Sequence, residues 1–590
     1  MKRFSILAAL TAVLVIFLDL QQASPDQVSG NVPIKEFLGV NAQVANNPTD
    51  LAQVAGWVRD YHKWDWYEAT QGVYTWSTGW QNLDRFYSAL KSLGVKVMPG
   101  VERVPDWALQ PTPTPPSSGP TPVPRRVPRY DAHASYLGAL VSHYGDTIAA
   151  VENYNEPDTW TITDRLTPGE FGAMTAQDYP SVKAANPGIP MVLAGMAGSD
   201  TPYLDAMDEW AVGQYDVLNF HWYANGDELN GGISPEALNV FDPIDEMKAW
   251  RDIYRPGKPI WVTEFGWDTS MAADGRKSKI YAPEASAANY LLRALFLMMG
   301  HGVDKAFVYL YRDTTDNPAY LHYLYFSAGL VVDQWPETDG RKKVGWYYLA
   351  TLKNILGDYV FDGIVSGGPN IYRYEFRLPG TDKRAAVMWA RDGDRDYGFQ
   401  SSYSGPPGLL VEPTVGSTSG TQSATDGNLV LTERPVFVLY EGSPPILPPT
   451  PTPIPRVDPP PRATDERLVN GDFENGFDGW YIPSWFSSSV SPSWSRVHSG
   501  LKSLKFEGDW VGPYVEQSVD VSPGDIVRFS GWVNVRKNTS GKAFKAILKV
   551  YAQWNRPLGS FELAHVPGTT DGWVPISSTV VMPDSTVRAE

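Results

Sequence analysis

Short apolar runs alternate with helical patterns between residues 37 and 356 of the chain. The runs have the length of buried strands and span 37–43, 57–61, 95–101, 149–155, 191–195, 217–223, 259–265 and 305–311. Apolar residues at helical spacing lie between and after them, as in 83–93, 132–144, 168–185, 285–300 and 344–356. This alternation predicts an α/β fold, a (β/α)8 TIM barrel over residues 30–358. A doubly wound sheet alternates in the same way, but no glycine-rich phosphate turn follows the first run.

After residue 358 the pattern changes to short strands without helices. The clearest strand candidates are 371–377, 385–389 and 436–440. They predict a small accessory β-domain over 359–442, packed on the barrel. Residues 443–464 contain ten prolines, and proline lacks the amide donor and fixes φ, which indicates an extended linker.

The last segment, residues 465–590, again shows short strands separated by Gly, Pro and Ser turns. This pattern predicts a β-sandwich of the jelly-roll type. A second proline-rich stretch, 111–128, interrupts the strand–helix rhythm after the third strand. We interpret it as a long surface loop and not as a domain boundary.

The amino terminus has the pattern of an export signal. Lys2 and Arg3 precede the apolar run 6–18, and the small residues Ala23 and Ser24 follow it. This predicts a signal peptide over 1–26 and a secreted or cell-surface location, as for a bacterial extracellular protein. An uncleaved amino-terminal membrane anchor is the alternative, although the run is shorter than the roughly 20 residues of a spanning helix.

The composition of this 590-residue chain limits the ligands that it binds and the chemistry that it performs. The formal net charge of −17 disfavours nucleic acid as a partner. The absence of cysteine from the sequence excludes disulfides, thiolate metal sites and a cysteine nucleophile. Aromatic residues make up 13% of the chain, which suits sugar rings but also ordinary cores.

Two glutamates lie at the ends of two predicted barrel strands, the edge at which barrel enzymes carry their reactive residues. Glu156 follows the fourth strand and Glu264 ends the seventh. Glycoside hydrolysis needs such a pair, because one carboxylic acid protonates the departing oxygen while the other carboxylate attacks or stabilises the sugar cation. We expect burial or a like charge to raise the pKa of the acid, and hydrogen-bond donors to keep the nucleophile ionised.

The stretch from Gly39 to about Tyr440 resembles the clan A glycoside hydrolases, in particular the family 39 β-xylosidases and exopolysaccharide glycosidases. The matching pieces are Trp57-Val58-Arg59, Gly72-Val73-Tyr74-Thr75-Trp76, Val104-Pro105-Asp106-Trp107, Asn155-Glu156-Pro157, His221-Trp222-Tyr223 and Thr263-Glu264-Phe265-Gly266. The resemblance implies a retaining glycosidase of polysaccharide or oligosaccharide, with Glu156 as general acid/base and Glu264 as nucleophile. It also implies a carboxyl separation of about 5–5.5 Å. No cofactor is expected in the barrel, and no metal.

The same resemblance assigns supporting residues. Asn155 would hold the sugar 2-hydroxyl, Tyr223 and Arg59 would donate to Glu264, and His221 would line the same wall. Tryptophans after strand ends are candidate sugar platforms, although core packing is the alternative for each: Trp64, Trp66, Trp107 and Trp267. The chain departs from the clan at the eighth strand, where Tyr309-Leu310-Tyr311-Arg312 stands in place of a frequent tryptophan.

The final segment resembles carbohydrate-binding modules of families 4 and 9, the cenC type, beginning with Leu468-Val469-Asn470-Gly471-Asp472-Phe473-Glu474. The resemblance implies a sugar-binding module that lacks its last strand. Its structural calcium would lie near Asp472 and Glu474. Candidate sugar contacts are Trp485, Trp494, Trp510 and Gln517, whereas the strand patterns around Trp532 and Trp573 predict core positions. A purely structural or protein-binding sandwich is the alternative.

Two other functions compete with a glycosidase. The first is a non-catalytic barrel that only binds polysaccharide, which the presence of both glutamates disfavours. The second is another barrel enzyme, such as an aldolase or a metal hydrolase. That reading needs a Schiff-base lysine or clustered histidines at strand ends, and His221 is the one strong histidine candidate there.

Overall fold

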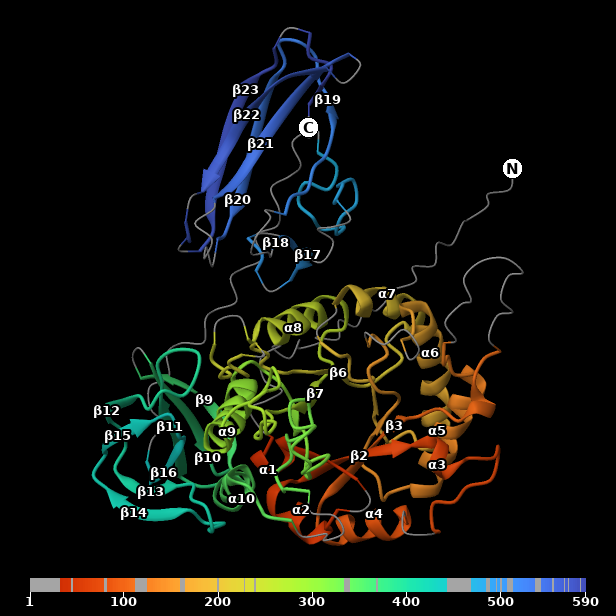
Figure 1. The fold of residues 1–590 in the computed structure, drawn as a ribbon, viewed down its shortest axis with the longest axis vertical. Helices are drawn as coiled ribbons and strands as arrows, with labels where there is room; N and C mark the ends of the chain where they lie inside the picture. The colour runs from red at the N-terminus through yellow and green to blue at the C-terminus, as the bar shows by residue number, and fades with distance from the viewer. Residues whose placement is uncertain are drawn as a thin grey trace, which may run out of the picture.

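A computed structural model shows an α/β barrel, a neighbouring antiparallel sheet and a separate group of strands at the carboxyl terminus (Figure 1). The structure describes residues 32–442 and 468–589 except for short gaps at 44–45, 79–81, 112–124, 160–164, 199–200, 228, 238–239, 334–339, 368–369, 484–488, 495, 499–500, 507–512, 536–542, 554–555, 567, 571 and 584. The expected export signal and linker lie outside the described residues, as does most of the loop 111–128. The domain limits assigned from the sequence stay predictions.

The barrel consists of parallel strands in the order β5-β4-β3-β2-β1-β8-β7-β6. The strands are β1 (Leu38–Ala42), β2 (Trp57–Lys63), β3 (Lys96–Glu102), β4 (Val151–Glu152), β5 (Met191–Val192), β6 (Leu218–His221), β7 (Ile260–Phe265) and β8 (Lys305–Val308). A parallel bridge between Val192 and Val217 joins the two ends of this sheet. The predicted (β/α)8 fold is therefore confirmed.

Helices follow the strands and surround the barrel (Figure 1). They are α2 (Pro48–Val54), α4 (Leu83–Ser92), α5 (Tyr130–Tyr144), α6 (Pro168–Ala185), α7 (Thr201–Ala211), α8 (Asp242–Tyr254), α9 (Glu284–Gly300) and α10 (Val344–Leu356). Shorter turns of helix are α1 (Ile34–Phe37), α3 (Trp64–Tyr67) and a 3-10 turn at Asp106–Ala108. Local sequence sets the helix starts: α6 begins with a capping box in which Thr167 and Glu170 satisfy each other's backbone amides, and Pro168 occupies the first turn.

Side chains at alternate strand positions fill the barrel in layers. Near the amino-terminal ends of the strands the layer is apolar and contains Trp57, Met98, Ala150, Val192, Val217, Trp261 and Phe307. Two positions further along the same strands the buried side chains are polar, and they include Arg59, Glu152, Asn219 and Thr263. The apolar layer therefore closes the bottom of the barrel, and the polar layer supports the carboxyl-terminal mouth.

An antiparallel sheet packs on the barrel through α9. Its strands run in the order β14-β13-β16-β11-β10-β9, with bounds β9 (Val360–Ser366), β10 (Ile371–Arg377), β11 (Lys383–Ala390), β13 (Gly408–Glu412), β14 (Thr421–Thr425) and β16 (Val436–Glu441), beside a two-stranded pair of β12 (Gln400–Ser404) and β15 (Asn428–Thr432). Phe296 of α9 contacts the rings of Phe376, Trp389 and Phe437 from this sheet. The sheet and the barrel thus share one apolar core.

The carboxyl-terminal strands form further antiparallel sheets (Figure 1). They are β17 (Val490–Ser493), β18 (Ser503–Phe506), β19 (Val519–Asp520), β20 (Ile526–Val533), β21 (Phe544–Ala552), β22 (Arg556–Val566), β23 (Val574–Val581) and β24 (Arg588–Ala589). A separate apolar cluster that includes Leu548, Val550 and Met582 joins the strands from β19 to β24.

Within the described part of the chain, no helix combines the length and the apolar character that crossing a bilayer requires.

The layered barrel packing generates a stability prediction. Gly39 lies in β1, and a Cβ at this position would lie 2.2 Å from Cδ1 of Phe307. We expect Gly39→Ala to reduce the free energy of unfolding by about 1–3 kcal/mol, because a close-packed core tolerates added volume poorly. Thermal unfolding should show a lower midpoint. Gly198→Ala is the matched control, since its Cβ would meet no described atom within 4 Å; equal midpoints for the two variants would contradict this packing.

Candidate active site

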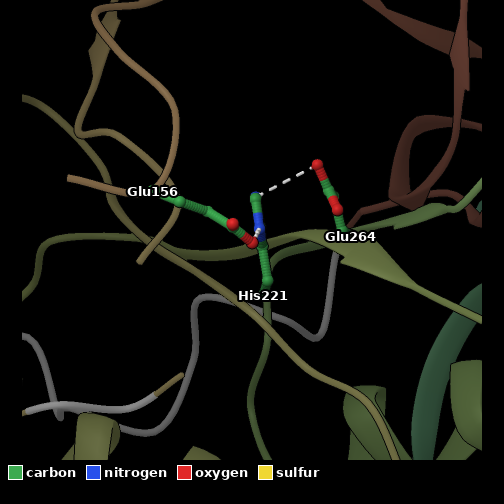
Figure 2. A group of neighbouring side chains, drawn as sticks. All are labelled: Glu156, His221 and Glu264. Carbon is green, nitrogen blue, oxygen red and sulfur yellow. Dashed lines mark hydrogen bonds and ion pairs between the residues drawn. The ribbon is translucent and has the colours of Figure 1, made fainter. Parts of the chain in front are cut away.

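The two predicted glutamates face one another at the mouth of the barrel (Figure 2). Glu264 lies in β7 and is 5% exposed. Glu156 follows β4, its backbone has a φ of 42°, and its amide donates to the carbonyl of Gly195 over 2.9 Å. One oxygen of each carboxylate and a ring nitrogen of His221 all lie within 4.8 Å of one another. The structure therefore brings both carboxylates to one point from two different strand ends.

A β-bulge turns Glu264 into the barrel. Phe220 of β6 pairs with Val262, but the next residue, His221, pairs with Glu264, so Thr263 is the extra residue on β7. Thr263 donates to Asn219 in the polar layer, while Glu264 bonds side chains at the mouth. Two consecutive residues of one strand thus both point inward, and bulges beside active sites commonly re-aim side chains in this way.

Three donors surround the Glu264 carboxylate. Nη1 of Arg59 donates to Oε1 over 2.8 Å, and the hydroxyl of Tyr61 donates to the same oxygen. The hydroxyl of Tyr223 donates to Oε2 over 2.8 Å. Donors of this kind stabilise the ionised form of a carboxylate. Arg59 and Tyr223 lie where the sequence predicted them, and Tyr61 was not anticipated, although it lies two positions after Arg59 on β2 and so on the same face.

Arg59 is itself fixed by the polar layer beneath. Its Nε and Nη2 donate to the buried carboxylate of Glu152, its Nη1 to Asn41, and its Nη2 to Oδ1 of Asn155 over 2.8 Å. The amide nitrogen of Asn155 has no hydrogen-bond acceptor among the described residues. It is therefore open to a ligand, as the predicted contact with a sugar hydroxyl requires.

His221 bridges the two glutamates. Its Nδ1 lies 2.8 Å from Oε1 of Glu156, and its Nε2 lies 3.5 Å from Oε1 of Glu264. Burial disfavours the charged imidazole, but the charge of Glu264 and the hydrogen bond and charge of Glu156 outweigh it and raise the pKa of His221. Gly195 makes room for the ring, because a Cβ there would lie 2.2 Å from Nε2 of His221.

The pKa of Glu156 differs from the sequence expectation. Burial would raise it, but the hydrogen bond from His221 and the charges of His221 and Arg59 bring the pKa of Glu156 below its ordinary value. The expected rise was wrong because it considered burial and like charge, and not the imidazole placed against the carboxylate. The raised pKa of His221 and the lowered pKa of Glu156 therefore favour the imidazole when this pair holds a single proton.

Tyrosines complete the wall beside Glu264. Tyr309 directly follows β8, and its ring centroid lies 6.4 Å from that of Tyr223 and 5.6 Å from that of Tyr325. Burial and the charges of Glu156 and Glu264 raise the pKa of Tyr325, which lies on the loop after β8. Asp268 holds this loop in place, because its Oδ2 accepts a hydrogen bond from the amide of Tyr325 over 3.0 Å. No pattern in the sequence pointed to Tyr325, because only the folded loop brings it to the site.

The four predicted barrel tryptophans divide into two groups. Trp64 and Trp267 are 0% and 2% exposed, and their indole nitrogens donate to Glu68 and to the carbonyl of Ile233. Their prediction as sugar platforms was wrong, because core packing covers both rings. Trp107 is partly buried and donates to the carbonyl of Glu68. Trp66 is partly buried, with Lys63 Nζ 4.2 Å and the Arg103 guanidinium 5.7 Å from its ring centroid.

The carboxyl-terminal predictions also divide. Trp485 and Trp510 lie outside the described residues. Trp494 is 6% exposed and belongs to an apolar core, so its prediction as a platform was wrong. The Gln517 amide bonds the backbone of Val469 and Gly479, which indicates a structural role in place of the predicted sugar contact.

The predicted calcium residues show no assembled site in the described part of the chain. Glu474 accepts the backbone amides of Leu501 and Lys502, and Asp472 accepts the amide of Glu474 over 3.5 Å. No third acidic or histidine side chain there converges on them, whereas calcium takes six to eight oxygen ligands. The calcium site stays a prediction.

Glu156, His221 and Glu264 are spaced closely enough to hold a metal ion. The guanidinium of Arg59 lies 2.8 Å from Glu264, and a fixed cation beside the same oxygen opposes a second one. The bonds from Tyr61 and Tyr223 also occupy lone pairs that a metal would need. The geometry favours acid–base chemistry over metal binding.

The contact between His221 and Glu156 generates a pH prediction. Replacing the imidazole in His221→Asn removes the hydrogen bond and the charge of His221, which lower the pKa of Glu156, and leaves burial, which raises it, opposed by the charge of Arg59. We therefore expect the pKa of Glu156 to increase in this variant. A pH titration of 13C-labelled glutamate carboxyls by NMR measures the shift, with the exposed Glu441 as internal control. An unchanged or lower pKa would contradict the proton assignment.

Comparisons with known proteins bear on this site. A family model described as "Glycosyl hydrolase catalytic core" matches residues 132–317. This interval contains Glu156, His221 and Glu264. A search of curated protein sequences finds no significant match.

Among solved structures, a GH30 endoxylanase from Clostridium papyrosolvens C71 aligns with a TM-score of 0.49 and 14% identity, covering 70% of this chain and 98% of its own. A GH39 β-xylosidase from Caulobacter crescentus gives 0.46 and 16%, covering 70% and 97%. A glucosidase from Croceicoccus marinus gives 0.44 and 12%, covering 95% of each chain. At these scores the likenesses carry no argument about substrate or mechanism. The catalytic-core match and the paired carboxylates inside it identify this chain as a glycosidase.

Proposed function

We propose that the chain is a retaining glycoside hydrolase that cleaves O-glycosidic bonds of a polysaccharide or oligosaccharide by double displacement. The observation that carries this proposal is the approach of the Glu156 and Glu264 oxygens to within 4.8 Å. Retaining enzymes hold their carboxyl groups about 5–5.5 Å apart, whereas inverting enzymes leave about 6.5–9.5 Å for a water molecule. The short separation supports direct attack by one carboxylate.

In the first step Glu264 attacks the anomeric carbon while Glu156 protonates the glycosidic oxygen. The bond from the anomeric carbon to the leaving oxygen breaks, and a glycosyl ester forms on Glu264. Arg59, Tyr61 and Tyr223 orient the nucleophilic carboxylate by donating to it. In the second step Glu156 takes a proton from water, the water oxygen bonds the anomeric carbon, and the ester breaks to restore the carboxylate of Glu264.

The proton for the first step resides on the Glu156–His221 pair. Since the pKa of Glu156 is lowered and that of His221 is raised, the free enzyme carries this proton on the imidazole. The 2.8 Å contact between Nδ1 and the carboxylate allows its transfer to Glu156 as the leaving oxygen approaches. His221 is then a positioning residue that stores the proton of the general acid.

The carboxyl-terminal strands are proposed as a sugar-binding module of the cenC type. Trp532 of β20 is 47% exposed and its ring stacks on His498 with centroids 3.8 Å apart. Its sequence prediction as a core residue was wrong, because the ring lies on an open strand face. A flat aromatic surface of this kind suits a sugar ring, and tethering would raise the local concentration of glycan at the barrel. Export to the cell surface or medium is proposed from residues 1–26.

Hydrolysis tests the reaction directly. On a panel of aryl glycosides and polysaccharides, proton NMR of early product should show the anomeric configuration of the substrate. We expect Glu264→Gln to abolish turnover, because it removes the nucleophile. Glu156→Ala should reduce turnover of glycosides with poor leaving groups by about 10²–10⁴-fold. Azide should restore turnover of an activated aryl glycoside in Glu156→Ala and give a glycosyl azide with retained configuration.

Glu441→Gln is the control, because this exposed glutamate lies in β16, away from the barrel mouth. Its activity should equal that of the wild type. Early appearance of the opposite anomer would contradict double displacement. Binding of glycans by the wild type without hydrolysis of any of them would favour the alternative of a non-catalytic polysaccharide-binding barrel.

A further inference from the structure

A third carboxyl group faces the barrel mouth and has no part in the reaction described above. Glu102 is the last residue of β3. A Cβ on Gly100, two residues earlier, would lie 3.0 Å from Oε2 of Glu152 and 3.1 Å from Nε of Arg59. Gly100 therefore faces the barrel interior, and strand alternation turns Glu102 to the same side.

Strand register fixes the height of Glu102 in the barrel. Tyr61 pairs with Gly100, and Lys63 pairs with Glu102 one pair of positions closer to the mouth. Glu102 therefore lies one layer closer to the mouth than Gly100 and Tyr61, and the Tyr61 hydroxyl contacts Glu264.

The Glu102 carboxyl has no hydrogen-bond or ion-pair partner in the part of the chain that the structure describes, and it is half-buried. Burial and the charge of Glu264 raise its pKa to about 7, while the charges of Lys63, Arg59 and Arg103 oppose the rise. The neighbouring Lys63 ammonium lies against the ring of Trp66. Solvent still reaches this half-buried carboxyl, so a ligand hydroxyl can replace water as its hydrogen-bond donor.

Resting on the glycosidase function proposed above, we propose that Glu102 is a specificity-determining residue that accepts hydrogen bonds from hydroxyls of the sugar unit held at Glu264. Its two oxygens suit neighbouring hydroxyls of a sugar ring. Glu102 selects the sugar, and Glu156 and Glu264 cleave its bond.

A double-mutant cycle tests this contact, in which the Glu102 carboxyl and single sugar hydroxyls are removed separately and together. The full-length enzyme is assayed on the aryl glycoside that it hydrolyses best and on the monodeoxy analogues of that glycoside. We expect Glu102→Ala to lower kcat/KM for the parent about 10- to 100-fold, the usual effect of losing a hydrogen bond to a charged group. The wild type should lose a similar factor on one deoxy analogue, and Glu102→Ala should treat this analogue and the parent alike. If Glu102→Ala still prefers the parent glycoside over this deoxy analogue by the wild-type factor, the proposal is overturned.

A second readout does not require turnover. The 13C carboxyl resonance of Glu102, assigned by its absence in Glu102→Gln, is followed during titration with methyl glycosides of xylose, glucose, galactose and arabinose. A saturable shift with at least one sugar is the expected result, and an unmoved resonance at every concentration would overturn the proposal. A shift without hydrolysis of any substrate would refute the reaction but keep Glu102 as a sugar contact. Glu441→Ala should leave both readouts unchanged.

Stability separates a binding role from a structural one. A carboxyl whose pKa is raised on folding makes the protein less stable as pH rises from 4.5 to about 7, because the unfolded chain ionises first, and above about 7 the loss is complete. We therefore expect Glu102→Gln to unfold at the same or a higher temperature than the wild type at pH 8, while its kcat/KM falls. A lower unfolding temperature in proportion to the lost activity would indicate that Glu102 is structural.

Discussion

Arg59 is 1% exposed at the centre of the barrel, and its guanidinium joins the polar layer to the carboxylate of Glu264. Below, it donates to Glu152, which also accepts from Asn219 and from the amide of Gly195. Above, it donates to Glu264. A buried cation is tolerable only when it is paired and fully hydrogen-bonded, so these strand-end residues must all lie where the guanidinium requires them. The pairing of this one buried charge therefore constrains the positions of Glu152, Asn155 and Glu264.

The two glutamates of the site are oriented relative to Arg59 and His221. The bulge in β7 aims Glu264 at Arg59, and the left-handed backbone at Glu156 turns its carboxyl toward His221. Between the two carboxylates, His221 interacts with both charges. Two acidic groups so close would otherwise repel one another, and an imidazole that holds a proton lowers this repulsion. The same ring explains why Glu156 has a lowered pKa.

The sequence did not predict correctly which tryptophans are buried in a core and which are exposed. Trp64, Trp267 and Trp494 were predicted as sugar contacts because they follow strand ends or lie in a resembling module, and all three are buried. Tryptophan stabilises a core through its large apolar area, so residue type alone does not separate a platform from a core ring. Trp532 shows the opposite case, since a strand position predicted burial and the ring is exposed. Arg59 and both glutamates were predicted from their strand-end positions together with the motifs around them, whereas Glu102, also at a strand end, lies in none of these motifs.

The sequence by itself determined the barrel and the strand-end positions of its two glutamates. Apolar period and helical spacing set the order of strands and helices, and the strand-end address of Glu156 and Glu264 followed from that order. Only the tertiary structure decided which side chains meet. The β7 bulge, the loop that carries Tyr325 and the register that lifts Glu102 above Tyr61 depend on contacts between residues far apart in the chain. Local patterns encode the period of an element, whereas a bulge, a loop path or a proton position results from the balance of all neighbours in the folded state.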